Sequence, residues 1–157
     1  MDIAVDVHDE AGADRSPTHQ SLDTQWRRPW LSIFNTCGHG FGSVRPYVYE
    51  HLGLWDLVKD AFGALELERH QVGPKAFHIE AKIGDSVIVL EIADPPHPHG
   101  SQSSIYVYVP DVDAAYRRAL ERGASSVAAP MDKPYQERSA GVRDPFGNTW
   151  WISAYRA

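Results

Sequence analysis

His78 and Glu80 are the two residues whose spacing best fits acid–base chemistry. They lie two positions apart in FHIEAKI, a segment with the alternation typical of a β-strand. Side chains two positions apart on a strand point to the same face, so an imidazole and a carboxylate would lie side by side there. Such a pair can transfer protons to and from a substrate. A solvated outer face and an interfacial ion pair explain the same spacing, and both remain alternatives.

Aromatic side chains repeat with the same two-residue spacing in two other segments. Tyr106 and Tyr108 share a face of one predicted strand, and Trp151 and Tyr155 share a face of another. If these faces line a cavity, the rings would suit a flat apolar or cationic small molecule, held by stacking and by tyrosyl hydrogen bonds. The alternatives are a cavity filled by its own side chains and a cavity covered by another part of the chain.

Cys37, His97 and His99 carry weaker signals. Cys37 is the one cysteine, so an internal disulfide is excluded, and its neighbours offer no base to activate the thiol. His97 and His99 stand among prolines and form at best an adventitious metal site, because a functional site needs three or four converging donors. We therefore expect neither a cysteine nucleophile nor a metal at these positions.

Length and charge limit the class of protein. The chain has 157 residues and a formal net charge of −6, and this length is enough for one domain with a real core. Its basic residues are scattered among acidic ones, which argues against nucleic-acid binding, since that needs clustered Lys and Arg. No long apolar segment suggests membrane insertion or secretion. We therefore expect a cytoplasmic protein that binds neither nucleic acid nor membrane.

The elements that must position the candidate residues form an internal repeat, in which each copy is a βαβββ unit with Gly-Ala after the helix. The first copy is predicted as strand Val44–Tyr49, a helix over about His51–Phe62, and strands Leu65–His70, Phe77–Ile83 and Ser86–Ile92. The apolar stripe of its helix is Leu54, Leu57, Val58, Ala61 and Phe62. The second is predicted as strand Ser104–Val109, a helix capped by Asp111, strand Ser125–Ala128, a loop from Pro130, and strands Ala140–Arg143 and Thr149–Tyr155 joined by a type I turn at Asp144–Gly147.

Composition divides the chain into a tail, an arm and a domain. Residues 1–25 are acidic and lack periodicity, which predicts a mobile tail, and residues 26–43 predict an aromatic arm. Residues 44–157 form the predicted domain, with modules 44–93 and 104–157. The connector 94–103 is rich in proline, which continues neither a strand nor a helix.

Two stretches carry a resemblance to a known family. The sequence IYVYVPDVDAAYRRALERGA followed by GVRDPFGNTWWIS resembles the second module of the vicinal oxygen chelate superfamily, the glyoxalase/bleomycin resistance/dioxygenase group. The first module, with AFGALELER and FHIEAKIGDSVIVLE, is most similar to its PhnB-like branch. The resemblance implies an α+β fold in which two βαβββ modules form a cup-shaped mixed sheet, with binding or catalysis inside the cup. Fold alone does not say which.

The resemblance also locates the positions at which metal-dependent members hold their ion. These positions correspond approximately to Val44, Val89, Ser104 and Trp151. Val and Trp side chains offer no metal donor, and a Ser hydroxyl is a poor ligand for a transition metal. A shift of register would add only Glu91 and Tyr47. We therefore expect no metal and no other cofactor.

Together these observations favour a metal-independent protein that sequesters a drug or metabolite. Tyr106, Tyr108 and Trp151 would be the stacking walls, and Glu91 or Glu80 would fix a polar or cationic group; Tyr155 and Val89 complete the predicted ligand site. The alternatives are a lyase, isomerase or dioxygenase that uses a displaced metal site or the His78/Glu80 pair, and a noncatalytic interaction domain. The family resemblance also implies a homodimer.

Overall fold

The computed structural model describes residues 44–96, 98 and 100–156. The predicted tail and arm, Cys37, His97 and His99 lie outside these residues. No helix within the described residues is long and apolar enough to cross a membrane.

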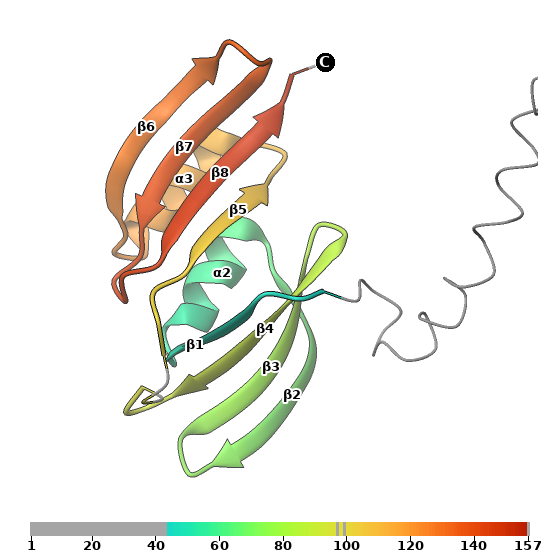
Figure 1. The fold of residues 1–157 in the computed structure, drawn as a ribbon, viewed down its shortest axis with the longest axis vertical. Helices are drawn as coiled ribbons and strands as arrows, with labels where there is room; N and C mark the ends of the chain where they lie inside the picture. The colour runs from blue at the N-terminus through green and yellow to red at the C-terminus, as the bar shows by residue number, and fades with distance from the viewer. Residues whose placement is uncertain (1–43, 97, 99, 157) are drawn as a thin grey trace, which may run out of the picture.

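The described chain consists of two βαβββ modules (Figure 1). The first contains β1 (Tyr47–His51), α2 (Leu54–Phe62), β2 (Leu65–Gly73), β3 (Ala76–Ile83) and β4 (Ser86–Ala93). The second contains β5 (Ser104–Tyr108), α3 (Val112–Glu121), β6 (Ser125–Lys133), β7 (Glu137–Arg143) and β8 (Thr149–Tyr155). The predicted α+β class and the duplicated unit are confirmed.

Each module builds its own four-stranded mixed sheet. The strand orders are β1-β4-β3-β2 and β5-β8-β7-β6, with β1/β4 and β5/β8 parallel and the other pairs antiparallel. The edge strands β1 and β5 lie at the junction between the modules, and both helices cover the same side of the sheets (Figure 1). We call the side of each sheet that faces away from the helices its open face.

The helices follow the apolar periodicity of the sequence. In α2 the whole predicted stripe is buried: Leu54, Leu57, Val58, Ala61 and Phe62. The predicted cap of α3 is confirmed, because Asp111 Oδ1 accepts a hydrogen bond of 2.9 Å from the Ala114 amide. Gly63 and Gly123 follow the helices with φ of 70° and 90°, a backbone region that favours glycine.

The predicted boundary between β1 and α2 is wrong by several residues. Residues Tyr47–His51 pair in register with Val89–Ala93, so His51 ends the strand instead of starting the helix. Its imidazole Nδ1 then accepts a hydrogen bond of 3.1 Å from the Gly53 amide in the turn before α2. Pairing with the neighbouring strand therefore determines this boundary, and local composition does not.

The segment predicted as a loop from Pro130 instead forms the end of β6, a turn and the start of β7. Strand β6 continues to Lys133, and β7 begins at Glu137, three residues before the predicted start at Ala140. A register shift between Ala128 and Met131 takes Pro130 out of regular pairing. β6 is an edge strand, and edge strands and bulges are the positions where a sheet tolerates proline.

The modules pack against each other through buried contacts. The Trp150 ring is fully buried, and its centroid lies 4.9 Å from the centroid of the Phe62 ring in the other module. Arg118 of α3 donates hydrogen bonds of 2.7 Å and 3.0 Å to the carbonyl oxygens of Asp60 and Ala61 at the end of α2. The described modules therefore share one core.

The predicted turn after β7 is confirmed and reinforces this junction. The Gly147 amide donates to the Asp144 carbonyl over 3.1 Å, and the Asp144 carboxylate accepts four further hydrogen bonds. Asn148, directly after the turn, also donates to Glu50 of the first module over 3.3 Å. The turn thus connects the end of β1 with the centre of the second sheet.

Candidate functional site

A cavity of about 380 Å³ lies at the junction between the modules. The β3–β4 hairpin lines one side of it, and β5 together with Trp150 lines the other. Most lining side chains are apolar, among them Ile83, Val87, Ile105 and Val107. Tyr106 and Tyr108 also border the cavity, and these residues are about half exposed, at 49% and 58%. The cavity is therefore apolar inside, and two phenols border it.

Both phenols are held by one carboxylate. Tyr106 OH donates to Glu137 Oε2 over 2.6 Å, and Tyr108 OH donates to Glu137 Oε1 over 2.7 Å. The centroids of the two rings are 5.4 Å apart. Ser153 donates a further hydrogen bond of 2.6 Å to the Tyr106 hydroxyl. The second sheet thus presents a carboxylate with two ordered aromatic rings on its open face.

These hydrogen bonds also fix the protonation states. Donation from Tyr106 and Tyr108 lowers the pKa of Glu137. The hydrogen bond to Glu137 raises the pKa of Tyr108 to about 12, and burial followed by the bond to Glu137 raises the pKa of Tyr106. The carboxylate is therefore ionised and both phenols are protonated near neutral pH.

Trp151 and Tyr155 lie on the same open face, but neither lines the cavity. Trp151 pairs with Tyr106 in register, and its ring covers Gly141, where an added Cβ would stand 2.7 Å from a ring carbon. Tyr155 pairs with Glu137, and its hydroxyl donates to Gln136 Oε1 over 2.7 Å. Both residues extend the aromatic surface beyond the cavity.

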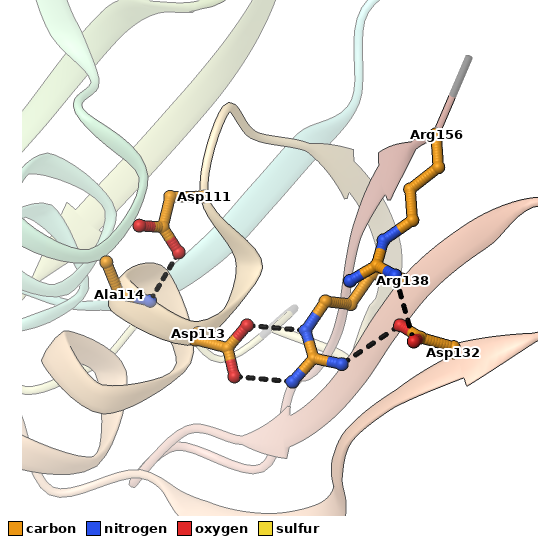
Figure 2. A network of polar contacts seen from close by, with 6 residues as sticks. All are labelled: Asp111, Asp113, Ala114, Asp132, Arg138 and Arg156. Carbon is orange, nitrogen blue, oxygen red and sulfur yellow. Dashed lines mark hydrogen bonds and ion pairs between the residues drawn. The ribbon is translucent and has the colours of Figure 1, made fainter.

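The backbone next to Glu137 is anchored on the opposite side of the sheet. The next residue, Arg138, points to the helix side, where its guanidinium binds both carboxylate oxygens of Asp113 at the start of α3 (Figure 2). It also donates to Asp132 Oδ1 over 2.9 Å, and Asp132 in turn pairs with Arg156. These ion pairs tie the start of β7 to α3 and β6, so the Glu137 position is set by rigid elements.

The open face of the first sheet carries a second group of polar side chains. Within this group, His78 and Glu80 are not bonded to each other. His78 Nδ1 lies 3.0 Å from Glu91 Oε2, and Tyr47 OH donates to the same oxygen over 2.8 Å. Glu80 is instead paired with Arg45 at 2.7 Å. His78 and Glu80 do share a face, but the carboxylate partner of His78 is Glu91. Val89, which pairs with Tyr47 and Glu80, lies on the same face.

This polar group is a poor fit for a transition metal. No cluster of three or more His, Cys, Asp or Glu suited to an ion occurs in the described part of the chain. Burial, together with the bond to Glu91, raises the pKa of Tyr47, so its phenol keeps its proton and is a weak ligand. His78 and Glu91 alone provide two donors, fewer than a metal site needs.

Glu137 is the site residue that the sequence analysis missed. The sequence predicts a loop from Pro130 that includes Glu137, and no facing direction can be predicted in a loop. A signal was nevertheless present, because Glu137, Ser139 and Gly141 alternate in step with Trp151 and Ser153 on the neighbouring strand.

Comparison with known proteins identifies the relatives of this architecture. Residues 50–152 match the family model described as Glyoxalase/Bleomycin resistance protein/Dioxygenase superfamily. An uncharacterized protein of Mycobacterium tuberculosis is 35% identical over 127 residues, covering 69% of this chain and 74% of that protein.

Two crystal structures illustrate the shared fold. TioX from Micromonospora sp. ML1 aligns with a TM-score of 0.57 at 22% identity, covering 71% of this chain and 95% of TioX. Lactoylglutathione lyase from Agrobacterium tumefaciens aligns with a TM-score of 0.50 at 19% identity, covering 71% and 90%. At these identities the likeness shows the fold alone.

Proposed function

This chain belongs to the glyoxalase/bleomycin resistance protein/dioxygenase superfamily, and we propose that within it, in its PhnB-like branch, the protein binds a small organic molecule without a metal. Its role would be to sequester a drug or metabolite. The observation that carries this proposal is the apolar cavity between the modules, bordered by Tyr106 and Tyr108. A volume of about 380 Å³ falls in the range of about 300–1,000 Å³ that is usual for small-molecule sites.

The chemistry of the lining supports an apolar or aromatic ligand. Ile83, Val87, Ile105 and Val107 offer dispersion contacts, and burial of apolar ligand surface in such a site is favourable. Tyr106 and Tyr108 add ring faces for stacking at the border. Polar groups that could orient a ligand are few, which is typical of binding pockets.

A substitution that obstructs the cavity tests this proposal. Ser86 lines the cavity but is itself exposed, so Ser86→Phe adds a ring at its mouth without disturbing buried packing. A screen of planar compounds by thermal shift and calorimetry should yield ligands whose affinity falls at least about tenfold in Ser86→Phe, equivalent to about 1.4 kcal/mol. Ser125→Phe, at an exposed position on β6, is the matched control and should bind like the wild type. Equal binding by both variants would contradict the proposed site.

We also predict that the protein needs no metal. The family's ligand positions hold Val44, Val89, Ser104 and Trp151, and Tyr47, His78 and Glu91 already bond one another. Dialysis against EDTA should therefore leave the melting temperature and ligand affinity unchanged. One transition-metal ion per chain in elemental analysis, retained through dialysis, would refute this prediction.

A second candidate function is proton transfer by His78. Its Nδ1 bonds Glu91, and a carboxylate in that position orients an imidazole as a general base. If this holds, the protein should accelerate hydrogen–deuterium exchange next to the carbonyl in some member of a panel of small carbonyl compounds. His78→Gln should lose about 10²–10⁴-fold of that rate, whereas His70→Gln should not. Exchange at the buffer rate for the whole panel would exclude this activity.

We further propose a cytoplasmic homodimer. Strands β2 and β6 are edge strands of nine residues each, and exposed edges of this length favour pairing with another chain. Light scattering should give about twice the monomer mass of 17.5 kDa. A mass equal to that of the monomer at micromolar concentration would contradict the dimer.

A further inference from the structure

The geometry around Glu137 points to the charge of the ligand: we propose that this carboxylate binds the ammonium group of an organic cation whose apolar body occupies the cavity. The inference rests on the proposed function, because it names the ligand class of the same site. It adds a subsite outside the cavity, on the open face of the second sheet.

Glu137 carries a charge that no basic side chain neutralises within the described residues. Lys133 lies opposite it on β6, but its Nζ turns to Met131 Sδ, 3.1 Å away. Arg138, the next residue along the strand, is bound to Asp113 and Asp132 on the helix side. The only partners of the Glu137 carboxylate in the described structure are two neutral phenols. An added cation would therefore meet an unpaired anion.

The surroundings of the carboxylate select an organic cation. Tyr106 and Tyr108 each occupy one carboxylate oxygen, and a carboxylate has about four acceptor sites in total. Acceptor sites therefore remain for an ammonium N–H group. The faces of tyrosine and tryptophan rings attract cations, and Trp151 and Tyr155 share this open face. A bare metal ion would gain little here, since one carboxylate is too few ligands.

Tyr106 and Tyr108 connect the two parts of the site. Their side chains border the cavity, while their hydroxyls bond Glu137 across the strand β8 that lies between β5 and β7. A ligand whose apolar part lies in the cavity would therefore bring a short cationic arm over the same two rings. The ligand class is an aromatic or aliphatic body that carries an amine on a short chain.

The carboxylate is also pre-positioned for this role. Arg138 fixes the start of β7 from the helix side (Figure 2), and the two phenols hold both oxygens on the open face. Ser153 donates to the Tyr106 hydroxyl and accepts from the Ser139 hydroxyl over 3.0 Å, which fixes the Tyr106 hydroxyl in turn. A site that is ordered before the ligand arrives loses less entropy on binding.

A pair of probes that differ in charge tests the inference. The probes are 4-phenylbutan-1-amine, which is protonated at neutral pH, and 4-phenylbutan-1-ol, which is not. Calorimetry on the full chain should give at least about tenfold tighter binding of the amine. Glu137→Gln, which keeps the shape and can still bond the tyrosines, should reduce amine affinity to that of the alcohol and leave alcohol binding unchanged. Glu121→Gln, an exposed carboxylate on α3, is the matched control and should change neither affinity.

Salt dependence gives a second readout that needs no variant. Raising the ionic strength from about 0.05 M to about 0.5 M should weaken amine binding to the wild type and leave alcohol binding unchanged, because an exposed charge pair is screened by salt. Equal affinity of the two probes for the wild type, or no loss of amine binding in Glu137→Gln, would overturn the inference while the proposed function stands. If neither probe binds, the inference fails; if the planar-compound screen is also empty, the proposed function fails too.

Discussion

Replacing Trp150 with alanine is expected to lower the free energy of unfolding by about 3–5 kcal/mol, the usual cost of removing a large buried aromatic side chain. The Trp150 ring is 0% exposed and packs against Phe62 across the module junction. Its indole Nε1 also donates to Asp144 Oδ2 over 2.9 Å. The variant would lose packing in both modules, enlarge the cavity and remove this hydrogen bond. Urea denaturation followed by circular dichroism measures the difference.

Trp151→Ala is the matched control for this prediction. The two tryptophans are adjacent on β8, but Trp151 is partly exposed on the open face, whereas Trp150 faces the helices. Trp151→Ala should therefore cost only about 1–2 kcal/mol of stability, in proportion to the smaller apolar area that it buries. A larger loss for Trp151 than for Trp150 would show that the module junction is less important for stability than its burial indicates.

Asp144→Ala is expected to have the second large effect, a loss of about 2–6 kcal/mol in the free energy of unfolding. The side chain is 3% exposed and accepts four hydrogen bonds of 2.9 Å each, from the amides of Phe146 and Asn148, the Asn148 side chain and the Trp150 indole. Alanine would leave at least two buried side-chain donors without an acceptor, each at a cost of about 1–3 kcal/mol. Denaturant titration of the variant measures this loss.

An exposed aspartate provides the comparison for Asp144. Asp56 in α2 pairs with Lys59 at the surface over 3.2 Å, and such pairs contribute about 0–1 kcal/mol. Asp56→Ala should therefore leave stability within that range. If Asp144→Ala were equally mild, water would have to replace the lost carboxylate, and the turn would be more open than the hydrogen bonds indicate.

The sequence predicted the fold well because its strongest signals are local and repeated. The apolar stripe of α2, the Asp111 cap and the turn at Asp144–Gly147 each depend on residues close together in the chain, and all three are confirmed. The errors occur where pairing with a distant strand decides the outcome. His51 joins β1 through its pairing with Ala93, and Pro130 lies within β6 because a bulge accommodates it.

The candidate site was harder to predict because its partners come from different strands. Alternation placed His78 and Glu80 on one face, but only the register of β3 with β4 shows that Glu91 is the carboxylate next to His78. The sequence predicts Tyr106 and Tyr108 as site residues, but it predicts a loop at Glu137, which binds both. Side-chain types and spacing identify candidates; strand register decides which of them meet.

The position of the cavity gives a bound ligand a mechanical role. One wall belongs to the β3–β4 hairpin and the other to β5, so each module provides one side. A ligand that fills the cavity must leave before the modules can separate, and its binding free energy therefore adds directly to the work of pulling them apart. Occupancy would slow hydrogen exchange at the α2–α3 contact, because Trp150 lines the cavity and packs against Phe62 at the end of α2.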